Sequence, residues 1–147
     1  MLLNILSSFT LAHSGVHSSV SLHFLNNETP LVQTSWGFIF ASEENWNWVC
    51  PEVLLQPSLY NIAVANNGDW WIASLGGLYY TNDQCNFNRV HFEDMYLSQI
   101  EIDQQNRIWI SSASGYQENA LWISEDQGLT FTPKISLGSD TRIYGFA

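Results

Sequence analysis

The chain has 147 residues, of which 46% are hydrophobic and 14% aromatic, enough to bury the core of one ordinary domain. Lysine and arginine total 4 against 14 acidic residues, which gives a formal net charge of −10. A surface of this charge repels phosphate backbones and anionic lipid headgroups, so we expect neither nucleic acid nor an anionic membrane surface as a partner.

Residues 1–14 form a short apolar stretch followed by small and polar residues. The stretch is too short to span a bilayer, so no membrane span is expected. An apolar stretch followed by small and polar residues is the order found in a secretory signal peptide, although the basic n-region is missing here. We therefore expect an exported protein, periplasmic or extracellular. The alternative is that these residues belong to an irregular strand of a preceding unit.

Twelve short runs rich in apolar, aromatic and β-branched residues follow, and no segment has a helical period. The predicted strands are 19–25, 31–35, 37–41, 46–49, 60–65, 70–74, 77–81, 86–92, 97–102, 107–112, 120–124 and 130–135. Residues 66–69, two asparagines, a glycine and an aspartate, are a hairpin signal between two of them. The sequence therefore predicts an all-β fold.

One pattern recurs three times along these strands. A small residue opens a run of three large apolar residues and a small residue closes it, at 37–41, 77–81 and 120–124. An acidic residue stands two places after the closing residue, and these are Glu43, Asp83 and Asp126. An aromatic residue then begins the next strand, at Trp48, Phe87 and Phe131. The repeat period of about 40 residues is typical of a four-stranded propeller blade.

The pattern has the chemistry of a turn between two strands. A carboxylate in such a turn can accept hydrogen bonds from backbone amides that otherwise have no partner. Gly128 follows the third acidic residue and supplies a positive φ that a residue with a Cβ adopts poorly. The aromatic residue that begins the outgoing strand can pack back over the turn. We therefore expect a structural role for these residues.

The third copy, residues 124–131, has the serine, aspartate, glycine, threonine and phenylalanine of the Asp-box signature. The chain thus resembles the Asp-box, or BNR-repeat, β-propellers of the sialidase-like and sortilin-like kind. The motif positions are Ala41, Glu43, Asn45 and Trp48, then Thr81, Asp83 and Phe87, then Ser124, Asp126, Gly128, Thr130 and Phe131. The resemblance implies a hairpin between the third and fourth strands of each blade, generally away from the ligand-binding face.

The resemblance covers residues 18–147 and implies a β-propeller of four-stranded antiparallel blades. The expected blades are 18–56, 57–94 and 95–138, and 139–147 would hold the first strand of a fourth. Because propellers close a ring of about four to eight blades, we expect an incomplete propeller. It is either truncated or an open arc that pairs with another copy, and the aggregation hazard of exposed sheet edges favours truncation.

Cys50 and Cys85 lie at equivalent edges of the first two units. In an exported protein they can form one disulfide, and the alternative is two free thiols. Exported bacterial Asp-box propellers of unassigned function, which the chain resembles most, often carry cysteines at these positions. The four histidines have no ligand spacing with the cysteines, so we expect no metal and no cofactor.

Two catalytic hypotheses come with the resemblance. Sialidases grip a substrate carboxylate with three arginines, one of them in an Arg-Ile-Pro motif. Arg107 and Arg142 are each followed by isoleucine but not by proline, so a complete sialidase site is not expected. A xyloglucanase-like hydrolase needs paired carboxylates and rings that stack on sugars. The candidate rings are Trp36, Trp70, Trp71 and Trp109, although such residues also fill the interface between blades.

The function that requires the fewest specific residues is a non-catalytic binding or scaffold module for a protein or glycan. Loops on a rigid scaffold commonly carry recognition. The expected partner surface comprises the blade-linking segments 51–59 and 91–95 and the loop 114–118. The alternative is a fragment of a glycoside hydrolase whose catalytic residues lie in missing blades.

Overall fold

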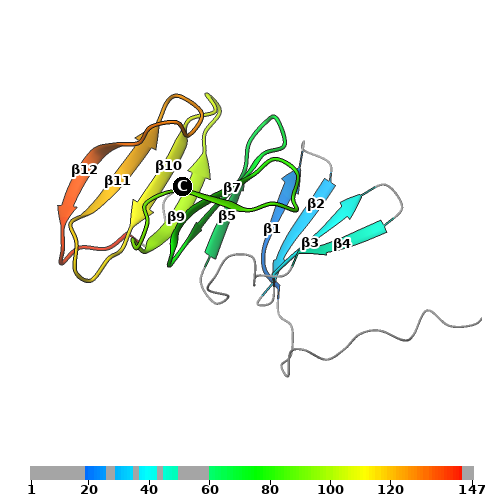
Figure 1. Cartoon of the computed structure of the whole chain (residues 1–147), viewed down its shortest axis with the longest axis horizontal. Coiled ribbons are helices and arrows are strands. Elements are labelled where there is room, and N and C mark those ends of the chain that lie inside the picture. The colour runs from blue at the N-terminus through cyan, green and yellow to red at the C-terminus, as the bar shows by residue number, and fades with distance from the viewer. Residues whose placement is uncertain (1–18, 26–28, 35–36, 43–44, 50–59, 144–147) are drawn as a thin grey trace, which may run out of the picture.

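The computed structural model describes residues 19–25, 29–34, 37–42, 45–49 and 60–143. These residues form twelve strands in three four-stranded sheets, and this part of the chain contains no helix. Figure 1 shows the three sheets side by side in chain order. The predicted all-β fold is confirmed. The described ranges contain no helix, and therefore no helix that could cross a membrane.

Within each sheet, every strand pairs antiparallel with the next one along the chain. The first sheet contains β1 (Ser19–Leu25), β2 (Thr29–Thr34), β3 (Gly37–Ser42) and β4 (Asn45–Val49). The second sheet contains β5 (Tyr60–Val64), β6 (Trp70–Ser74), β7 (Gly77–Thr81) and β8 (Asn88–His91). The third sheet contains β9 (Leu97–Ile102), β10 (Ile108–Ser112), β11 (Asn119–Ser124) and β12 (Thr132–Gly138).

β8 and β12 each start two residues later than the sequence predicts, because a turn takes up their first residues. The backbone amide of Asn86 donates to Asp83, and β8 begins only at Asn88. The backbone amide of Thr130 donates to Asp126, and β12 begins at Thr132. The polar side chain of the turn therefore competes with the sheet for backbone groups.

The second sheet lies between the other two and buries both of its faces. Neighbouring residues of a strand point to opposite faces, and Trp70 and Trp71 of β6 do so. Trp70 packs with Leu31 and Phe38 of the first sheet. Trp71 packs with Ile100 and other apolar residues of the third sheet. This double burial explains why every residue of β6 is buried.

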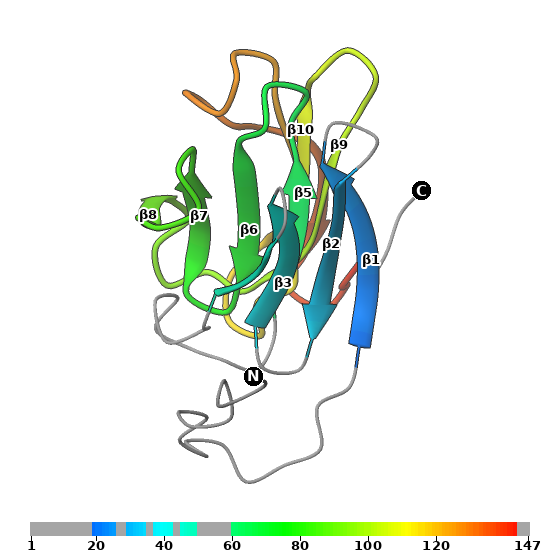
Figure 2. The same ribbon diagram turned by 90° about the vertical axis from the view of Figure 1, so that its right-hand side faces the viewer.

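The first strands of the three sheets lie together. β5 contacts both β1 and β9, and Figure 2 shows β1, β5 and β9 near one another. His23, Ala63 and Glu101 come from these three strands and line one small cavity of about 170 Å³. Burial lowers the pKa of His23, and the negative charge of Glu101 opposes that shift. The fourth strands, β4, β8 and β12, form the opposite sheet edges.

The chain returns from β12 across the start of β11. Asn119 is fully buried and its side-chain amide donates to the carbonyl oxygens of Ser139 at 3.3 Å and Thr141 at 2.9 Å. Residues 141–143 are not in a strand, and 144–147 lie outside the described residues. The predicted opening strand of a fourth blade therefore stays a prediction. Residues 1–14, the expected signal peptide, also lie outside.

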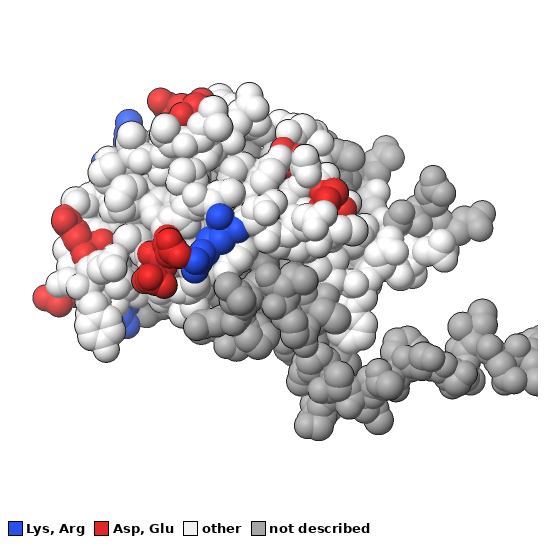
Figure 3. Space-filling view, in the orientation of Figure 1, with Lys and Arg blue, Asp and Glu red and all other residues white. Residues whose placement is uncertain are grey.

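Acidic side chains are spread over the surface. On the face drawn in Figure 3 they lie in separate small groups beside few basic ones. This distribution fits the net charge of −10.

Candidate functional site

The third repeated turn is held together by the carboxylate of Asp126. Its Oδ1 accepts from the backbone amide of Thr130 at 2.9 Å and from the Ser124 hydroxyl at 2.8 Å. Its Oδ2 accepts from the Thr130 hydroxyl at 2.6 Å. These bonds, the Thr130 hydroxyl first, lower the pKa of Asp126 to about 2. The prediction that this carboxylate accepts a backbone amide of its turn is confirmed.

The second turn has one residue fewer, and its carboxylate, that of Asp83, also accepts hydrogen bonds from the turn. Oδ1 of Asp83 accepts from the backbone amides of Cys85 at 2.9 Å and Asn86 at 2.8 Å. The side-chain amide of Asn86 donates to Oδ2 at 2.7 Å and so takes the part that a hydroxyl takes in the third turn. The two bonds from Asn86, followed by that from Cys85, hold the pKa of Asp83 well below its usual range.

The first copy of the repeated turn differs in the length of its connection. β3 and β4 pair up to Ser42 and Asn45, so only two residues connect them. Glu43 is one of those two and lies outside the described residues. Phe87 and Phe131 pack against the two core clusters, whereas the ring of Trp48 is 42% exposed.

The third turn lies directly against Trp71 of the second sheet. Gly128 has a φ of +85°, and a Cβ built on it would come within 2.1 Å of Cη2 of the indole. The ring nitrogen Nε2 of His91 donates to the carbonyl oxygen of Gly128 at 2.9 Å. Two residues of the second sheet, Trp71 and His91, thereby hold the turn in place.

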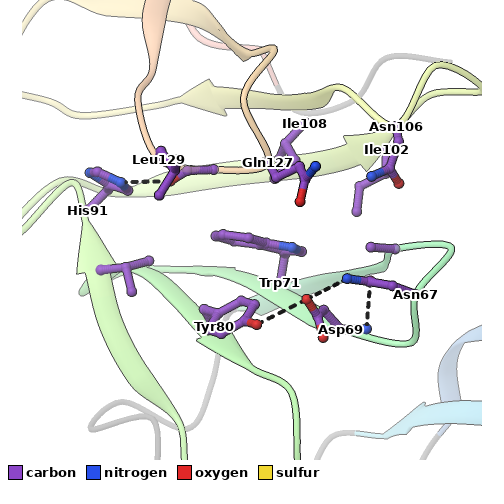
Figure 4. A pocket seen from close by; sticks show the side chains of 13 residues that line it. Asn67, Asp69, Trp71, Tyr80, His91, Ile102, Asn106, Ile108, Gln127 and Leu129 are labelled. Atoms are coloured by element: carbon purple, nitrogen blue, oxygen red, sulfur yellow. Dashed lines mark hydrogen bonds between the residues drawn. The ribbon is translucent and has the colours of Figure 1, made fainter.

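Below this turn lies a cavity of about 370 Å³ between the second and third sheets. Trp71 and Tyr80 form one wall, with ring centroids 4.7 Å apart. In Figure 4 the two rings lie beside Asp69, with Gln127 and Leu129 of the turn above them. The lining residues are Ala65, Asn67, Asp69, Trp71, Tyr80, Val90, His91, Ile102, Asn106, Ile108, Gln127, Gly128 and Leu129.

The cavity has one charged side chain, the carboxylate of Asp69. Its Oδ2 accepts from the Tyr80 hydroxyl at 3.0 Å and from the Asn67 side-chain amide at 2.8 Å. Burial first, and then the bond to Asp69 and its negative charge, raise the pKa of Tyr80. The β5–β6 turn, where Asn67 also accepts from the backbone amide of Asp69, thus positions the carboxylate.

Across the cavity stands Asn106, in the turn between β9 and β10. Its φ is +61°, which asparagine tolerates better than most residues. Its side-chain oxygen Oδ1 is buried and has no hydrogen-bond partner among the described residues. An unsatisfied buried acceptor costs about 1–3 kcal/mol, and this one belongs to a residue that lines the cavity.

The four predicted stacking rings do not come together. Trp71 lines the cavity. Trp70 is fully buried between the first and second sheets. Trp109 is on the other face of the third sheet, where its Nε1 donates to Asp103 at 2.9 Å. Trp36 lies outside the described residues.

Asp103 organises the surroundings of Trp109. It accepts from the Arg107 side chain at 2.6 Å, and the guanidinium lies over the Trp109 ring at 5.4 Å from its centroid. The bonds from Arg107 and then Trp109 hold the pKa of Asp103 well below its usual range. This carboxylate is therefore occupied in holding a turn.

Two of the segments predicted to meet a partner border a second cavity. Asp94 of the 91–95 connection and Tyr116 of the 114–118 loop line an open hollow of about 470 Å³, together with Arg142. The ring of Tyr116 is 99% exposed. The third predicted segment, 51–59, lies outside the described residues.

The expected disulfide gains no support. Cys85 is exposed and is a free cysteine, and Cys50 lies outside the described residues. No group of three or more histidine, cysteine, aspartate or glutamate side chains in the described ranges could hold a metal ion.

Sequence reasoning did not find Tyr80, Asn67 or Asn106 as cavity residues. Tyr80 follows the apolar alternation of a strand, and the other two carry the ordinary signal of a turn.

No protein-family model, curated protein or solved structure matches this chain.

Proposed function

We propose that the chain is a non-catalytic binding module that takes a sugar unit of a glycan into the cavity beside Trp71. The observation that carries the proposal is one cavity that combines an aromatic wall with two acceptors, Asp69 and Asn106, on facing turns. The proposal includes export, on the resemblance of residues 1–14 to a signal peptide.

A sugar ring fits this chemistry because it has an apolar C–H face and a rim of hydroxyl groups. The rings of Trp71 and Tyr80 can contact the apolar face. A hydroxyl can donate to Oδ1 of Asn106, the buried unpaired acceptor, when this side chain turns into the cavity. The volume of about 370 Å³ falls at the lower end of ordinary ligand pockets, which suits one sugar unit better than a long segment.

The cavity favours binding over hydrolysis. Most glycoside hydrolases act with two carboxylates on either side of the scissile bond. Asp69 is the one carboxylate among the lining residues, and Tyr80 and Asn67 already donate to it. A glycoside hydrolase with its catalytic residues in other blades is the alternative, and the experiment below separates the two.

We further propose that the three sheets are successive blades of an incomplete Asp-box β-propeller. Three observations support this arrangement. The first strands lie together and the fourth strands form the opposite edges. Adjacent sheets pack face to face. The Asp83 and Asp126 turns join the third and fourth strands of their sheets, as the Asp-box resemblance implies.

A glycan array, followed by titration calorimetry with the sugar that binds best, tests the binding proposal. Asn106→Gly removes the acceptor and keeps a residue that tolerates positive φ. We expect it to weaken binding about tenfold or more, which corresponds to about 1.4 kcal/mol. Asn88→Ala, at an exposed asparagine of β8, is the matched control and leaves affinity unchanged.

Three outcomes would contradict the proposal: an array with no bound sugar, equal affinity of the two variants, or release of a cleaved sugar by the wild-type protein. The last result would establish the hydrolase alternative. Melting temperatures of both variants, measured in parallel, separate a lost contact from a misfolded turn.

A protein partner is the second candidate, favoured by the fully exposed ring of Tyr116 beside Arg142 at the second cavity. Tyrosine and arginine are enriched among residues that dominate protein interfaces. Parallel pull-downs with the wild type and Tyr116→Ala test it, and only a protein lost from the variant would support this candidate.

A further inference from the structure

The carboxylate of Asp69 brings an uncompensated negative charge to the cavity beside Trp71. The described residues that line this cavity include no lysine, no arginine and no second carboxylate. None of the ion pairs between described residues involves Asp69. Its two hydrogen-bond donors, the Tyr80 hydroxyl and the Asn67 side-chain amide, are neutral groups. Neutral donors therefore hold this charge, and no cation of the described residues balances it.

One oxygen of this carboxylate remains available for a further donor. The Tyr80 hydroxyl and the Asn67 amide both donate to Oδ2, at 3.0 Å and 2.8 Å. Oδ1 of Asp69 accepts no hydrogen bond from the described residues, and it is not among their buried unpaired atoms, to which Oδ1 of Asn106 belongs. A donor that enters the cavity can therefore bind Asp69 without displacing a bond that it already accepts.

The turn between β5 and β6 holds the carboxylate in place before a ligand arrives. The backbone amide of Asp69 donates to the side-chain oxygen of Asn67 at 3.2 Å. The carbonyl oxygen of Asp69 accepts from the backbone amide of Ala65 at 2.9 Å. An acceptor that is fixed in advance loses little freedom on binding, which favours affinity.

Two aromatic rings stand beside this charge. The ring centroids of Trp71 and Tyr80 are 4.7 Å apart and their planes are inclined by 51°. In Figure 4 the Tyr80 ring lies next to the carboxylate of Asp69. Trp71 is only 6% exposed and lies against Gly128, whereas Tyr80 is half-buried. Tyr80 is therefore the ring that a ligand reaches more easily.

A positively charged group with several hydrogen-bond donors fits these surroundings. A primary ammonium has three N–H donors and no acceptor. It can donate to Oδ1 of Asp69, and the face of the Tyr80 ring attracts a cation. A neutral hydroxyl or amide can also donate to Asp69 but gains no attraction between opposite charges. An anionic group would meet the charge of Asp69 with no basic side chain in the described lining to offset it.

We propose that the sugar unit bound beside Trp71 is an amino sugar, whose ammonium group pairs with Asp69 and contacts the ring of Tyr80. This inference rests on the proposed sugar-binding function and names the class of sugar. The net charge of −10 supports it, because a protein of one charge sign raises the local concentration of ligands of the other sign. Sugars that carry a carboxylate are disfavoured for the same reason.

The Tyr80 hydroxyl supports this assignment by staying neutral. Burial first, and then the bond to Asp69 and its negative charge, raise the pKa of Tyr80. The phenol therefore stays protonated at neutral pH, where it donates to Asp69 and adds no negative charge of its own. The cavity thus has one fixed carboxylate, and the ring beside it is uncharged.

Titration calorimetry at about pH 7 with a matched series of sugars tests the proposal, because an amine with a pKa of about 8 is mostly charged there. Glucosamine, N-acetylglucosamine and glucose differ at one ring position, which carries an ammonium, a neutral amide or a hydroxyl. We expect glucosamine to bind about tenfold or more tightly than the other two. Glucuronic acid, which carries a carboxylate, should bind most weakly.

Salt gives a second measurement on the wild-type protein. Raising the salt concentration from about 0.02 M to about 0.5 M shortens the range of electrostatic attraction. The affinity for glucosamine should therefore fall, and the affinity for glucose should stay unchanged. This measurement and the sugar series need no variant, so they decide the question even if a substitution prevents folding.

Asp69→Asn removes the charge and keeps an oxygen that can accept from the Tyr80 hydroxyl. We expect it to weaken glucosamine binding about tenfold or more and to change glucose binding less than about twofold. Asp140→Asn removes one charge from an exposed residue outside the cavity lining and is the matched control. Its affinity for glucosamine should equal that of the wild type. Melting temperatures of both variants identify any loss of fold.

The outcomes distinguish this inference from the sugar site itself. Equal wild-type affinities for glucosamine and glucose, or equal effects of Asp69→Asn and Asp140→Asn, would overturn the ammonium assignment and leave the sugar site standing. Tetramethylammonium is the probe for a cation without a sugar. Binding of this ion with no binding of any sugar would overturn the sugar site, and no binding of any probe would overturn both.

Discussion

Gly128 lies so close to the indole of Trp71 that a single methyl group cannot be placed between them. The built Cβ would be 2.1 Å from Cη2, 2.7 Å from Cζ2 and 2.8 Å from Cζ3. The glycine therefore serves two purposes, a positive φ in the turn and a flat contact with the neighbouring sheet. This one contact links the repeated turn of the third sheet to the wall of the candidate site.

Gly128→Ala is expected to destabilise the fold by about 4 kcal/mol or more, in the range of severe single substitutions. Gly138 has a φ of +72° and nothing within 4 Å of its built Cβ, so Gly138→Ala carries the backbone strain alone. That strain is about 1–2 kcal/mol. Urea unfolding of both variants measures the difference, and equal losses would show that the contact with Trp71 is unimportant.

Asp126→Asn is expected to lower the melting temperature at neutral pH and to have little effect in strong acid. The bonds from Thr130 and Ser124 hold the folded pKa of Asp126 at about 2, below its ordinary value. A depressed carboxyl pKa stabilises the fold above the unfolded pKa of about 3.9, and this contribution is lost as the pH falls towards 2. Melting curves between about pH 2 and pH 7 check this window.

The control for Asp126→Asn is Asp140→Asn, at an exposed residue whose carboxylate accepts one long bond, from Ser139 at 3.4 Å. We also expect sugar affinity at pH 7 to be unchanged in Asp126→Asn, because Asp126 does not line the cavity. A loss of affinity without a loss of stability would assign this turn to binding.

Tyr80→Phe is expected to cost stability at neutral pH and to cost less in alkali. Burial and the carboxylate of Asp69 raise the folded pKa of Tyr80. A raised tyrosine pKa stabilises the fold below the unfolded pKa of about 10, and the contribution is lost as the pH rises through the folded pKa. The stability gap between wild type and variant should therefore narrow between about pH 8 and pH 10.5.

Urea unfolding at the two pH values measures that gap for Tyr80→Phe. Tyr116→Phe removes one phenol from an exposed position and is the control. A gap for Tyr80→Phe that is the same at both pH values would mean that the bond from the Tyr80 hydroxyl to Asp69 contributes nothing.

Asp103→Ala is expected to lower the melting temperature and to change the fluorescence of Trp109. The carboxylate accepts from the backbone amides of Gln105 and Arg107, both at 3.0 Å, and from the side chains of Arg107 and Trp109. Loss of this carboxylate removes the hydrogen bonds that hold both the turn and the indole of Trp109. The resulting shift in tryptophan emission should be absent when Asp103→Ala is introduced into a Trp109→Phe protein.

Glu125→Ala is the control for Asp103→Ala, since that carboxylate lies 3.9 Å from Arg107 but is 68% exposed. Exposed ion pairs contribute about 0–1 kcal/mol, so this variant should unfold close to the wild type. Equal effects of the two substitutions would show that Asp103 acts only as a charge near Arg107.

Much of the secondary structure could be predicted from the sequence because strand and turn signals are local. The ranges 19–25, 70–74, 77–81 and 97–102 are strands with the predicted bounds. The alternation of side chains in β6 follows from the strand geometry alone. The bonds of Asp83 and Asp126 to their own turns were likewise predictable, because donor and acceptor are within four residues of each other.

The candidate site was not predictable in the same way. Four tryptophans were candidates for stacking, and the sequence does not distinguish Trp71 from Trp70. Which of the two neighbours lines a cavity depends on which sheet packs on which face of β6. The unpaired acceptor of Asn106 likewise becomes visible only when a turn of the third sheet lies opposite a turn of the second.

The sequence by itself determined the strands, the repeated turns and the acidic surface, because each depends on residues close together in the chain or on composition. The tertiary structure decided which faces of the sheets are buried and where Trp71 meets Gly128. Those outcomes depend on contacts between sheets, and Trp71 and Gly128 are 57 positions apart along the chain. Only the packing of one sheet on the next brings the two residues together.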